Sequence, residues 1–242
     1  MIVLFTDFGL AGPYMGQVRA VLQRLAPAMP VIDLFADAPM RNPKAASYLL
    51  AAYAPWFPAG TVFLGVVDPG VGGERPALVV QADGRWYVGP GNGLFEILHR
   101  RADASEVFEI VWRPATLSAS FHGRDLFAPV AALIARGEAP PGAKRPADFA
   151  RHGDWPDDLA EVIYVDHYGN AMTGLRAALL RPDARLVAGH RRIDRARTFG
   201  GMPAGTALWY ENSTGLAEIA VNMGRADDAL GLVIGSAVQI VS

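Results

Sequence analysis

In the first third of the chain, the pattern of hydrophobic and polar positions predicts strands that alternate with helices. Apolar runs at residues 2–5, 31–35 and 61–67 are short enough to be buried β-strands. Between them, residues 14–25 and 43–53 repeat apolar side chains at helical spacing, and prolines end the first of these helices. This alternating order predicts an α/β domain with a central, mostly parallel sheet and right-handed crossovers.

After residue 70 the predicted strands and helices no longer alternate. An Asp83-Gly84 pair between two apolar runs is a hairpin signal, and a loop rich in glycine and asparagine follows it. The predicted elements here are a hairpin of residues 77–81 and 85–88, a short helix opened by residues 90–95, a strand at 107–112 and a helix ending near Gly137.

A second domain is predicted beyond a segment rich in Pro, Gly, Ala and Asp. We assign residues 1–140 to the N-terminal α/β domain, 141–156 to a linker and 157–242 to the C-terminal domain. Helical periodicity disappears after the linker, and short strands separated by turns predict a small antiparallel β-barrel. The predicted strands are residues 162–165, 185–188, 206–210, 216–221 and 237–241.

Composition narrows the functional classes. The 242 residues are 51% hydrophobic and 19% charged with a net charge of -2, which is typical of a globular protein and offers no basic field for nucleic acid. The absence of cysteine excludes disulfides, thiolate metal sites and a cysteine nucleophile. Residues 1–7 lack a basic leader and no apolar run reaches membrane-spanning length, so we expect a cytoplasmic protein without membrane partners.

The most informative stretch is the turn at residues 68–75, Asp-Pro-Gly-Val-Gly-Gly-Glu-Arg. It begins with a carboxylate at the end of a predicted strand, where open α/β sheets bind ligands. Its glycines allow close approach of backbone to a ligand, and Arg75 is permanently charged and near Asp68 in sequence. Taken alone, the stretch fits a structural turn with a surface salt bridge equally well.

Other candidate groups are scattered. Asp7 also follows a strand, and His122 precedes a predicted helix, where backbone N–H groups point outward. The five histidines show no helical zinc spacing, so no metal site is predicted. No nucleophile elbow, phosphate-binding loop or dinucleotide fingerprint is present. The polar stretches at 166–170 and 211–215 are, by themselves, ordinary hairpin turns.

Six of these segments together resemble the SAM hydroxide adenosyltransferases, hydrolases of S-adenosyl-L-methionine (SAM) that are related to fluorinases and chlorinases. The order and spacing of the segments match over nearly the whole chain. The resemblance implies an N-terminal α/β domain, a C-terminal β-barrel, and a homotrimer whose sites lie between domains of neighbouring subunits. The segments are Thr6-Asp7-Phe8-Gly9, residues 66–72, Pro90-Gly91-Asn92-Gly93-Leu94, Phe121-His122-Gly123-Arg124-Asp125, Asp166-His167-Tyr168-Gly169-Asn170 and Asn212-Ser213-Thr214-Gly215.

The resemblance also implies roles for individual residues. Asp68, Arg75 and His122 look like the triad that positions and polarises a water molecule. Asp7 looks like the carboxylate that holds both ribose hydroxyls, which suits a group that only accepts hydrogen bonds. The remaining implied substrate contacts are Asp166 and Asn170 on the methionine or adenosine portion, Ser213 on the methionine carboxylate, Asn222 at the adenine edge, and Phe121, Tyr168 and Trp209 as walls for the rings.

The implied reaction is hydrolysis of SAM to adenosine and L-methionine by attack of an activated water at C5′. Methionine leaves as a neutral group, so the reaction is expected to need neither a metal nor another cofactor. Either His122 or Asp68 can accept the proton of the water, whereas Arg75 contributes positive charge only.

Two alternatives stay open at this point. A halide could replace water as the nucleophile, but Asp68, His122 and Gly123 are all of the hydrolase type rather than the halogenating type. The chain could also be a non-catalytic adenosine or SAM sensor. Gly12, Ala36 and Gly91 depart from the residues usual in the family, which affects the expected hydrogen bonding near the ribose.

Overall fold

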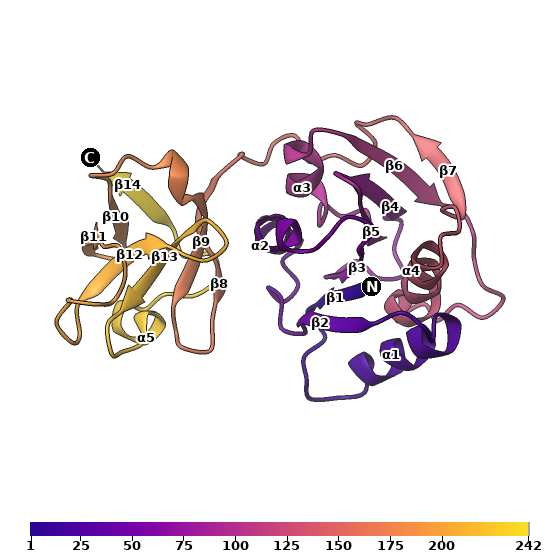
Figure 1. Cartoon of the computed structure of the whole chain (residues 1–242), viewed down its shortest axis with the longest axis horizontal. Helices are drawn as coiled ribbons and strands as arrows, with labels where there is room; N and C mark the ends of the chain where they lie inside the picture. The colour runs from indigo at the N-terminus through magenta and orange to yellow at the C-terminus, as the bar shows by residue number, and fades with distance from the viewer. Residues whose placement is uncertain (242) are drawn as a thin grey trace. The chain divides into compact units, whose positions relative to one another are not determined.

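The computed structural model describes residues 1–241 and divides into two compact units. The first unit is Met1–His152, and the second begins at Gly153. Figure 1 shows an α/β unit and a unit built almost entirely of strands. The α/β and β-barrel classes predicted from the sequence are therefore confirmed.

A seven-stranded sheet forms the centre of the first unit, in the order β2-β1-β3-β5-β4-β6-β7 (Figure 1). β2, β1, β3 and β5 are parallel neighbours, and the last three strands add in antiparallel pairs. β1 and β3 are buried along their whole length, as expected for apolar strands covered on both faces. The strands are β1 (Ile2–Thr6), β2 (Val31–Phe35), β3 (Val62–Val66), β4 (Ala77–Ala82), β5 (Arg85–Pro90), β6 (Ser105–Ile110) and β7 (Gly142–Arg145).

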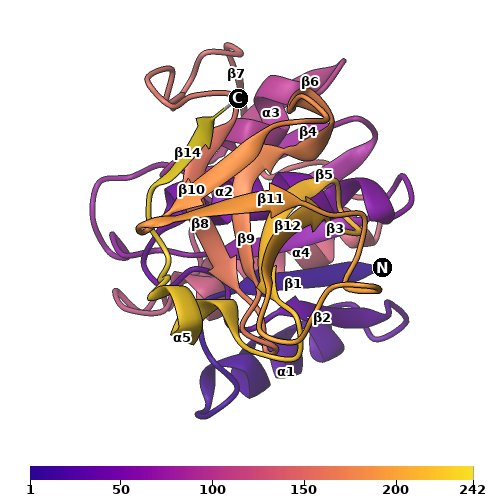
Figure 2. The same ribbon diagram turned by 90° about the vertical axis from the view of Figure 1, so that its left-hand side faces the viewer.

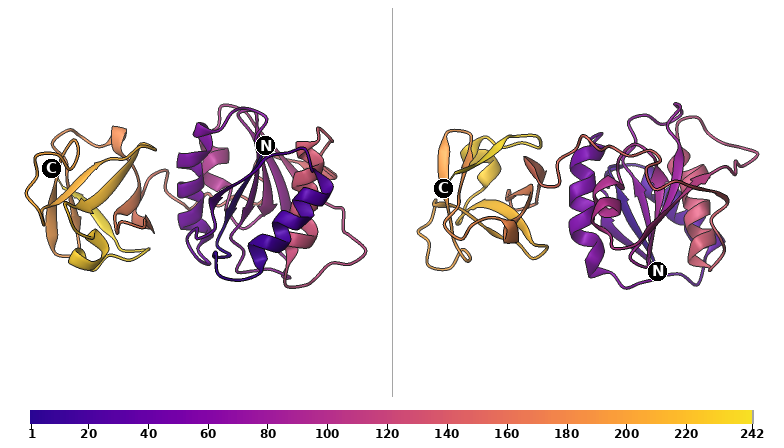
Figure 3. Two further views of the ribbon diagram at one scale, coloured as in Figure 1. Left: turned by 60° about the horizontal axis from the view of Figure 1, so that its bottom comes forward. Right: turned by 90° about the horizontal axis from the view of Figure 1, so that it is seen from above.

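Helices cover both faces of this sheet, so the unit has three layers (Figure 3). α1 and α4 pack together on one face, and α2 and α3 pack together on the other. The helices are α1 (Tyr14–Leu25), α2 (Pro43–Tyr53), α3 (Glu96–Arg101) and α4 (Ala128–Ala135), with a short 3₁₀ helix η1 (Ala54–Trp56) and a π-helical turn η2 (Gly123–Phe127) that leads directly into α4.

The segment predicted as a linker, residues 141–156, contains structure that belongs to the first unit. Strand β7 pairs with β6 at the sheet edge, so the first unit continues past residue 140 and ends at His152. All four residues of β7 are exposed, and the strand therefore carries no alternation of apolar and polar positions that the sequence could reveal.

A buried carboxylate anchors the end of the first unit. The Glu96 side chain is 1% exposed and accepts hydrogen bonds from Arg100 (2.7 Å), Arg151 (2.8 Å) and the backbone N–H of His152 (3.0 Å). Burial alone would raise the pKa of Glu96, but these donors outweigh it and lower the pKa to about 2. The acid therefore stays ionised and ties residues 151 and 152 to helix α3.

Seven strands form the second unit, in the order β14-β10-β11-β12-β13-β9-β8. The neighbours β14, β10, β11 and β12 can be followed in Figure 2. All pairs except β11 with β12 are antiparallel, and a bridge between Glu161 and Ala237 brings the two edges of the sheet together. The sheet is thus nearly closed into a barrel. Its elements are β8 (Leu159–Val165), β9 (Ala171–Arg176), η3 (Ala177–Leu179), β10 (Arg185–Ala188), β11 (Arg191–Arg195), β12 (Ala207–Glu211), β13 (Leu216–Val221), α5 (Ala226–Leu230) and β14 (Val238–Val241).

Two barrel strands, β9 and β11, were missing from the sequence prediction. β9 contains a glycine, which weakens a strand pattern, and four of the five residues of β11 are charged. Across residues 1–241, the structure contains no helix with the length and apolar character needed to cross a membrane.

Candidate active site

Polar side chains gather at the carboxyl ends of three neighbouring parallel strands. Asp7 follows β1, Asp68 follows β3 after one residue, and Asn92 follows β5. The chain leaves β1 toward β2 on one side and reaches β3 on the other, and open α/β sheets bind ligands at such reversals of strand order. The Asn92 amide donates to the Val67 carbonyl (2.9 Å) and so links the ends of β5 and β3.

The turn after β3 folds Arg75 back onto Asp68. Arg75 Nε lies 2.8 Å from Asp68 Oδ1 and 2.9 Å from Oδ2, and Arg75 Nη2 also donates to Oδ2. The side chains are only 10% and 5% exposed, respectively. The pair is therefore a buried, forked ion pair rather than the surface salt bridge that a purely structural turn would carry.

His122 completes the group from a distant part of the chain. Its Nδ1 lies 3.0 Å from Arg75 Nη2. A guanidinium only donates hydrogen bonds, so Nδ1 accepts and the neutral ring carries its proton on Nε2. Burial lowers the pKa of His122, and the positive charge of Arg75 lowers it further, which keeps the ring neutral.

Close backbone packing holds these two loops together. Gly72 has φ of +80°, and a Cβ at this position would lie 2.5 Å from the Ala119 carbonyl oxygen. Only glycine fits both the left-handed backbone and the contact. On the other side, Asp125 accepts from the Ser118 backbone N–H (3.0 Å), which ties the loop before His122 to the π-helical turn after it. The triad geometry thus rests on packing within the first unit.

Gly123, directly after His122, has an aromatic neighbour. A Cβ on Gly123 would lie 2.9 Å from Cζ of Phe8. A side chain here would force the Phe8 ring to move. The close packing of Phe8 therefore favours glycine at position 123.

Asp7 is held by the segment after β2. Its Oδ2 accepts from the backbone N–H of Arg41 (2.9 Å), and Arg41 has a left-handed backbone with φ of 55°. Burial raises the pKa of Asp7, and the charge of Asp68 raises it as well, although the Arg41 N–H opposes them. Arg41 was not predicted from the sequence, since a backbone donor has no residue-type signal. Asn92 was assigned no role, although it lies in one of the six segments shared with the family.

Two of the predicted ring walls are packed inside the protein. Phe121 is 8% exposed and makes edge contacts with Phe8 (5.7 Å) and Tyr14 (5.2 Å), so it supports the His122 turn. Trp209 is fully buried in the barrel and donates to the Ala184 carbonyl (3.1 Å). Trp209 is therefore a core residue, while substrate contact by Phe121 stays a prediction.

The second unit presents most of its predicted substrate residues on two tight turns. Asp166 accepts from both the backbone N–H (2.8 Å) and the side-chain amide (3.1 Å) of Asn170. Asn170 is buried, whereas Tyr168 at the tip of the same turn is 74% exposed. The Asp166 and Asn170 pair therefore fixes the turn that exposes the Tyr168 ring.

The other turn joins β12 to β13. Ser213 is exposed at its tip, directly after the buried Asn212. Asn222, directly after β13, donates its amide to the Met202 carbonyl (2.6 Å) and so holds the loop between β11 and β12. Within residues 1–241, no group of three or more His, Asp or Glu side chains is arranged to hold a metal ion.

Family models match almost the entire chain. The N-terminal domain of the SAM hydroxide adenosyltransferases matches residues 2–143, and the C-terminal domain of the same family matches residues 160–239. These ranges correspond to the two units of the structure.

Known proteins are similar over the same length. An (R)-S-adenosyl-L-methionine hydrolase of Thermus thermophilus is 39% identical, covering 99% of both chains, and one of Salinispora arenicola is 38% identical, covering 98% of this chain and 96% of the relative. A crystal structure of a conserved protein from Thermotoga maritima superimposes with a TM-score of 0.90 at 32% identity, covering 100% of both chains. The chain belongs to the SAM hydroxide adenosyltransferase family.

Proposed function

We propose that this protein hydrolyses SAM to adenosine and L-methionine. The observation that carries the proposal is the convergence of the buried Asp68 and Arg75 side chains with the partly buried His122 at the carboxyl edge of the sheet. Support comes from the family match over both units and from relatives named (R)-S-adenosyl-L-methionine hydrolase at 37% to 39% identity.

The protein must activate the nucleophile of this reaction, because water is a weak nucleophile and the sulfonium group leaves without assistance. A water oxygen forms a bond to C5′ while the bond between C5′ and sulfur breaks. The electron pair of the broken bond stays on sulfur, which becomes the neutral thioether of methionine. One proton of the water passes to a base on the protein. Because the leaving group needs neither protonation nor a Lewis acid, we propose that no metal or other cofactor takes part.

The hydrogen bonds favour Asp68 as the proton acceptor. The Nδ1 of His122 is already occupied by Arg75, and the free Nε2 carries a hydrogen in this tautomer. His122 is therefore suited to orient the water by donating to its oxygen. A carboxylate offers about four lone-pair sites, so Asp68 keeps capacity to accept a proton beside its contacts with Arg75.

Arg75 acts through its charge. It cannot serve as a base at accessible pH, but its guanidinium lies between the other two groups and stabilises negative charge that develops on the attacking oxygen. The cationic sulfonium loses its charge as the bond forms, so a nucleophile with hydroxide character is favoured in a site that excludes water.

Substrate contacts are proposed for residues of both units. Asp7 would bind the ribose hydroxyls, because its carboxylate keeps free acceptor sites beside its contact with Arg41. The contacts proposed on the remaining parts of SAM are those of Asp166, Asn170, Tyr168, Ser213, Asn222 and Phe121. From the resemblance to the family, we also propose a homotrimer that shares each site between subunits, and a cytoplasmic location.

The test is incubation of the purified protein with SAM in ¹⁸O-labelled water. We expect adenosine and methionine in equal amounts, with the label in the 5′-hydroxyl of adenosine. Tight binding of SAM without adenosine formation would indicate the sensor instead. A product with halogen at C5′ in the presence of chloride or fluoride would indicate the halide-using alternative, and light scattering of the same sample tests the trimer.

A further inference from the structure

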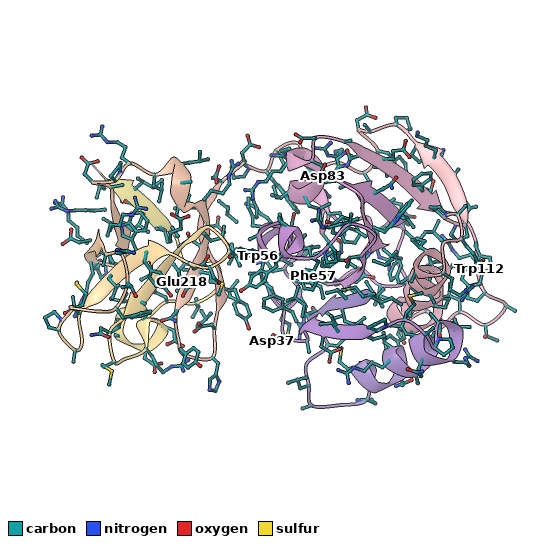
Figure 4. The ribbon with its side chains drawn as sticks, in the orientation of Figure 1. Asp37, Trp56, Phe57, Asp83, Trp112 and Glu218 are labelled. Atoms are coloured by element: carbon teal, nitrogen blue, oxygen red, sulfur yellow. The ribbon has the colours of Figure 1, made fainter. Side chains whose placement is uncertain are left out.

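A buried glutamate in the second unit has no part in the proposed chemistry. Glu218 lies on β13 and is 3% exposed (Figure 4). Within residues 1–241, no cationic side chain pairs with it. A buried carboxyl without a cation is unfavourable unless hydrogen bonds compensate for its lost hydration. The hydrogen-bond donors to its two carboxylate oxygens are therefore the contacts that stabilise it.

The two oxygens of Glu218 bind two neighbours on or just after β12. Tyr210, the cross-strand partner of Glu218, donates its hydroxyl to Oε1. Asn212 donates its amide Nδ2 to Oε2 at 2.8 Å. Burial raises the pKa of Glu218, whereas these two donors favour the ionised form. Both carboxylate oxygens are thus occupied within the barrel.

Asn212 transmits this contact to the exposed turn. Its Oδ1 accepts from the backbone N–H of Thr214 (3.0 Å), the Thr214 hydroxyl (2.9 Å) and the backbone N–H of Leu216 (3.0 Å). With Oδ1 turned toward three donors, Nδ2 can only face Glu218. The amide therefore joins the buried acid on one side to the β12–β13 turn on the other.

Ser213 is at the tip of this turn and is exposed. In the part of the chain that the structure describes, its hydroxyl has no hydrogen-bond partner. Because no neighbouring group fixes this hydroxyl, its position depends on the backbone of residue 213. That backbone is fixed by Asn212, and Asn212 is fixed by Glu218.

We propose that Glu218 is a positioning residue for substrate binding, which acts through Asn212 to present Ser213 to the carboxylate of the methionine portion of SAM. This inference rests on the proposed function. Glu218 itself contacts no substrate. Its loss should weaken SAM binding while leaving the chemical step at the triad unchanged, because all three triad residues belong to the first unit.

The first experiment is a double-mutant cycle on the full chain. Glu218→Leu and Ser213→Ala should each raise KM for SAM about tenfold with kcat within about twofold, and the double variant should be no worse than the poorer single variant. Glu218→Gln should stay within about threefold of wild type, because its oxygen can accept from Asn212 while its amide donates to Tyr210. Additive effects, or a Glu218→Gln variant as impaired as Glu218→Leu, would overturn the proposal.

A second pair of variants covers the case in which Glu218→Leu does not fold. Asn212→Asp puts an oxygen against the Glu218 carboxylate and should raise KM about tenfold. Combining it with Glu218→Gln restores a donor and acceptor pair and should return KM to within about threefold of wild type. Absence of this rescue in a folded double variant would contradict the inference.

The proposed function is tested separately by wild type in the same assay. If wild type converts no SAM, the hydrolase proposal fails, and the same cycles are then measured as Kd for SAM by calorimetry. Coupling in Kd would still support the role of Glu218, whereas additivity or absence of SAM binding by wild type would overturn it.

Discussion

The two units hold their candidate functional groups in different ways. In the first unit, Arg75 contacts both Asp68 and His122, and the Asp68 and Arg75 side chains are buried. In the second unit, Tyr168 and Ser213 are exposed on turns, and their supports are buried beneath them. Groups that react need a preorganised position, whereas groups that bind must be reachable. We therefore expect substitutions of Asp68, Arg75 and His122 to change kcat and substitutions in the two turns of the second unit to change KM.

The largest effect is expected for Asp68→Asn. The amide keeps an oxygen for Arg75 but cannot accept the proton, so kcat should fall about 10²- to 10⁴-fold with KM changed only a few-fold. Steady-state kinetics with SAM measure both values. Asp183→Asn is the matched control, because Asp183 also pairs with an arginine but is exposed; it should be unaffected. An equal loss in both variants would contradict the assignment.

His122→Ala should have a smaller effect on the same step. Removing the ring takes away one orienting donor but leaves the acid and the guanidinium in place, so kcat should fall about 10- to 10²-fold. A KM close to wild type is expected, because His122 is not assigned to substrate binding. Single-turnover measurements separate this loss from product release. Near wild-type turnover would exclude a role for the ring in the reaction.

Asp166→Asn tests the other side of the comparison. The substitution removes the charge of the turn and one acceptor for Asn170, so KM for SAM should rise about tenfold while kcat stays within about twofold. Calorimetric titration with SAM should show the same loss. A large fall in kcat at constant KM would mean that the division between the units does not hold.

The smallest expected effect concerns pH. Because the pKa of His122 is lowered by burial and by Arg75, the ring stays neutral down to a lower pH than a free histidine. Once protonated, Nδ1 can no longer accept the hydrogen bond from Arg75, and the two positive charges repel each other. We therefore expect kcat/KM to be constant above about pH 6.5 and to fall as pH decreases through the pKa of His122. A profile of kcat/KM for wild type and His122→Ala checks this. A limb centred above pH 6.5 would contradict it.

The sequence predicted the fold where patterns were strong. The apolar runs of β1 and β3 and the spacing in α1 placed the parallel half of the sheet and hence the edge that carries Asp7 and Asp68. The exposed β7 and the charged β11 carry no such pattern, and their pairing depends on neighbouring strands that a local reading does not supply.

Local sequence patterns likewise indicate only part of the candidate site. Asp68 and Arg75 share one turn, so their contact follows from local sequence. His122 joins them only because the loop before α4 packs on Gly72, and the sequence connected it to the pair through family resemblance alone. The Asn212 and Glu218 support could be read from neither source, since a carboxyl buried in a barrel is indistinguishable in sequence from a surface one.

The hydrogen bond from His152 to Glu96 determines where an N-terminal fragment of this protein should end. A fragment that ends at residue 140 would lack β7 and both donors at residues 151 and 152. It would leave β6 as an open sheet edge and an ionised acid with one arginine partner in the interior. Cutting after His152 retains both features. The smallest N-terminal piece that can be expected to stand alone is therefore determined by a buried acid, twelve residues beyond the point that composition suggests.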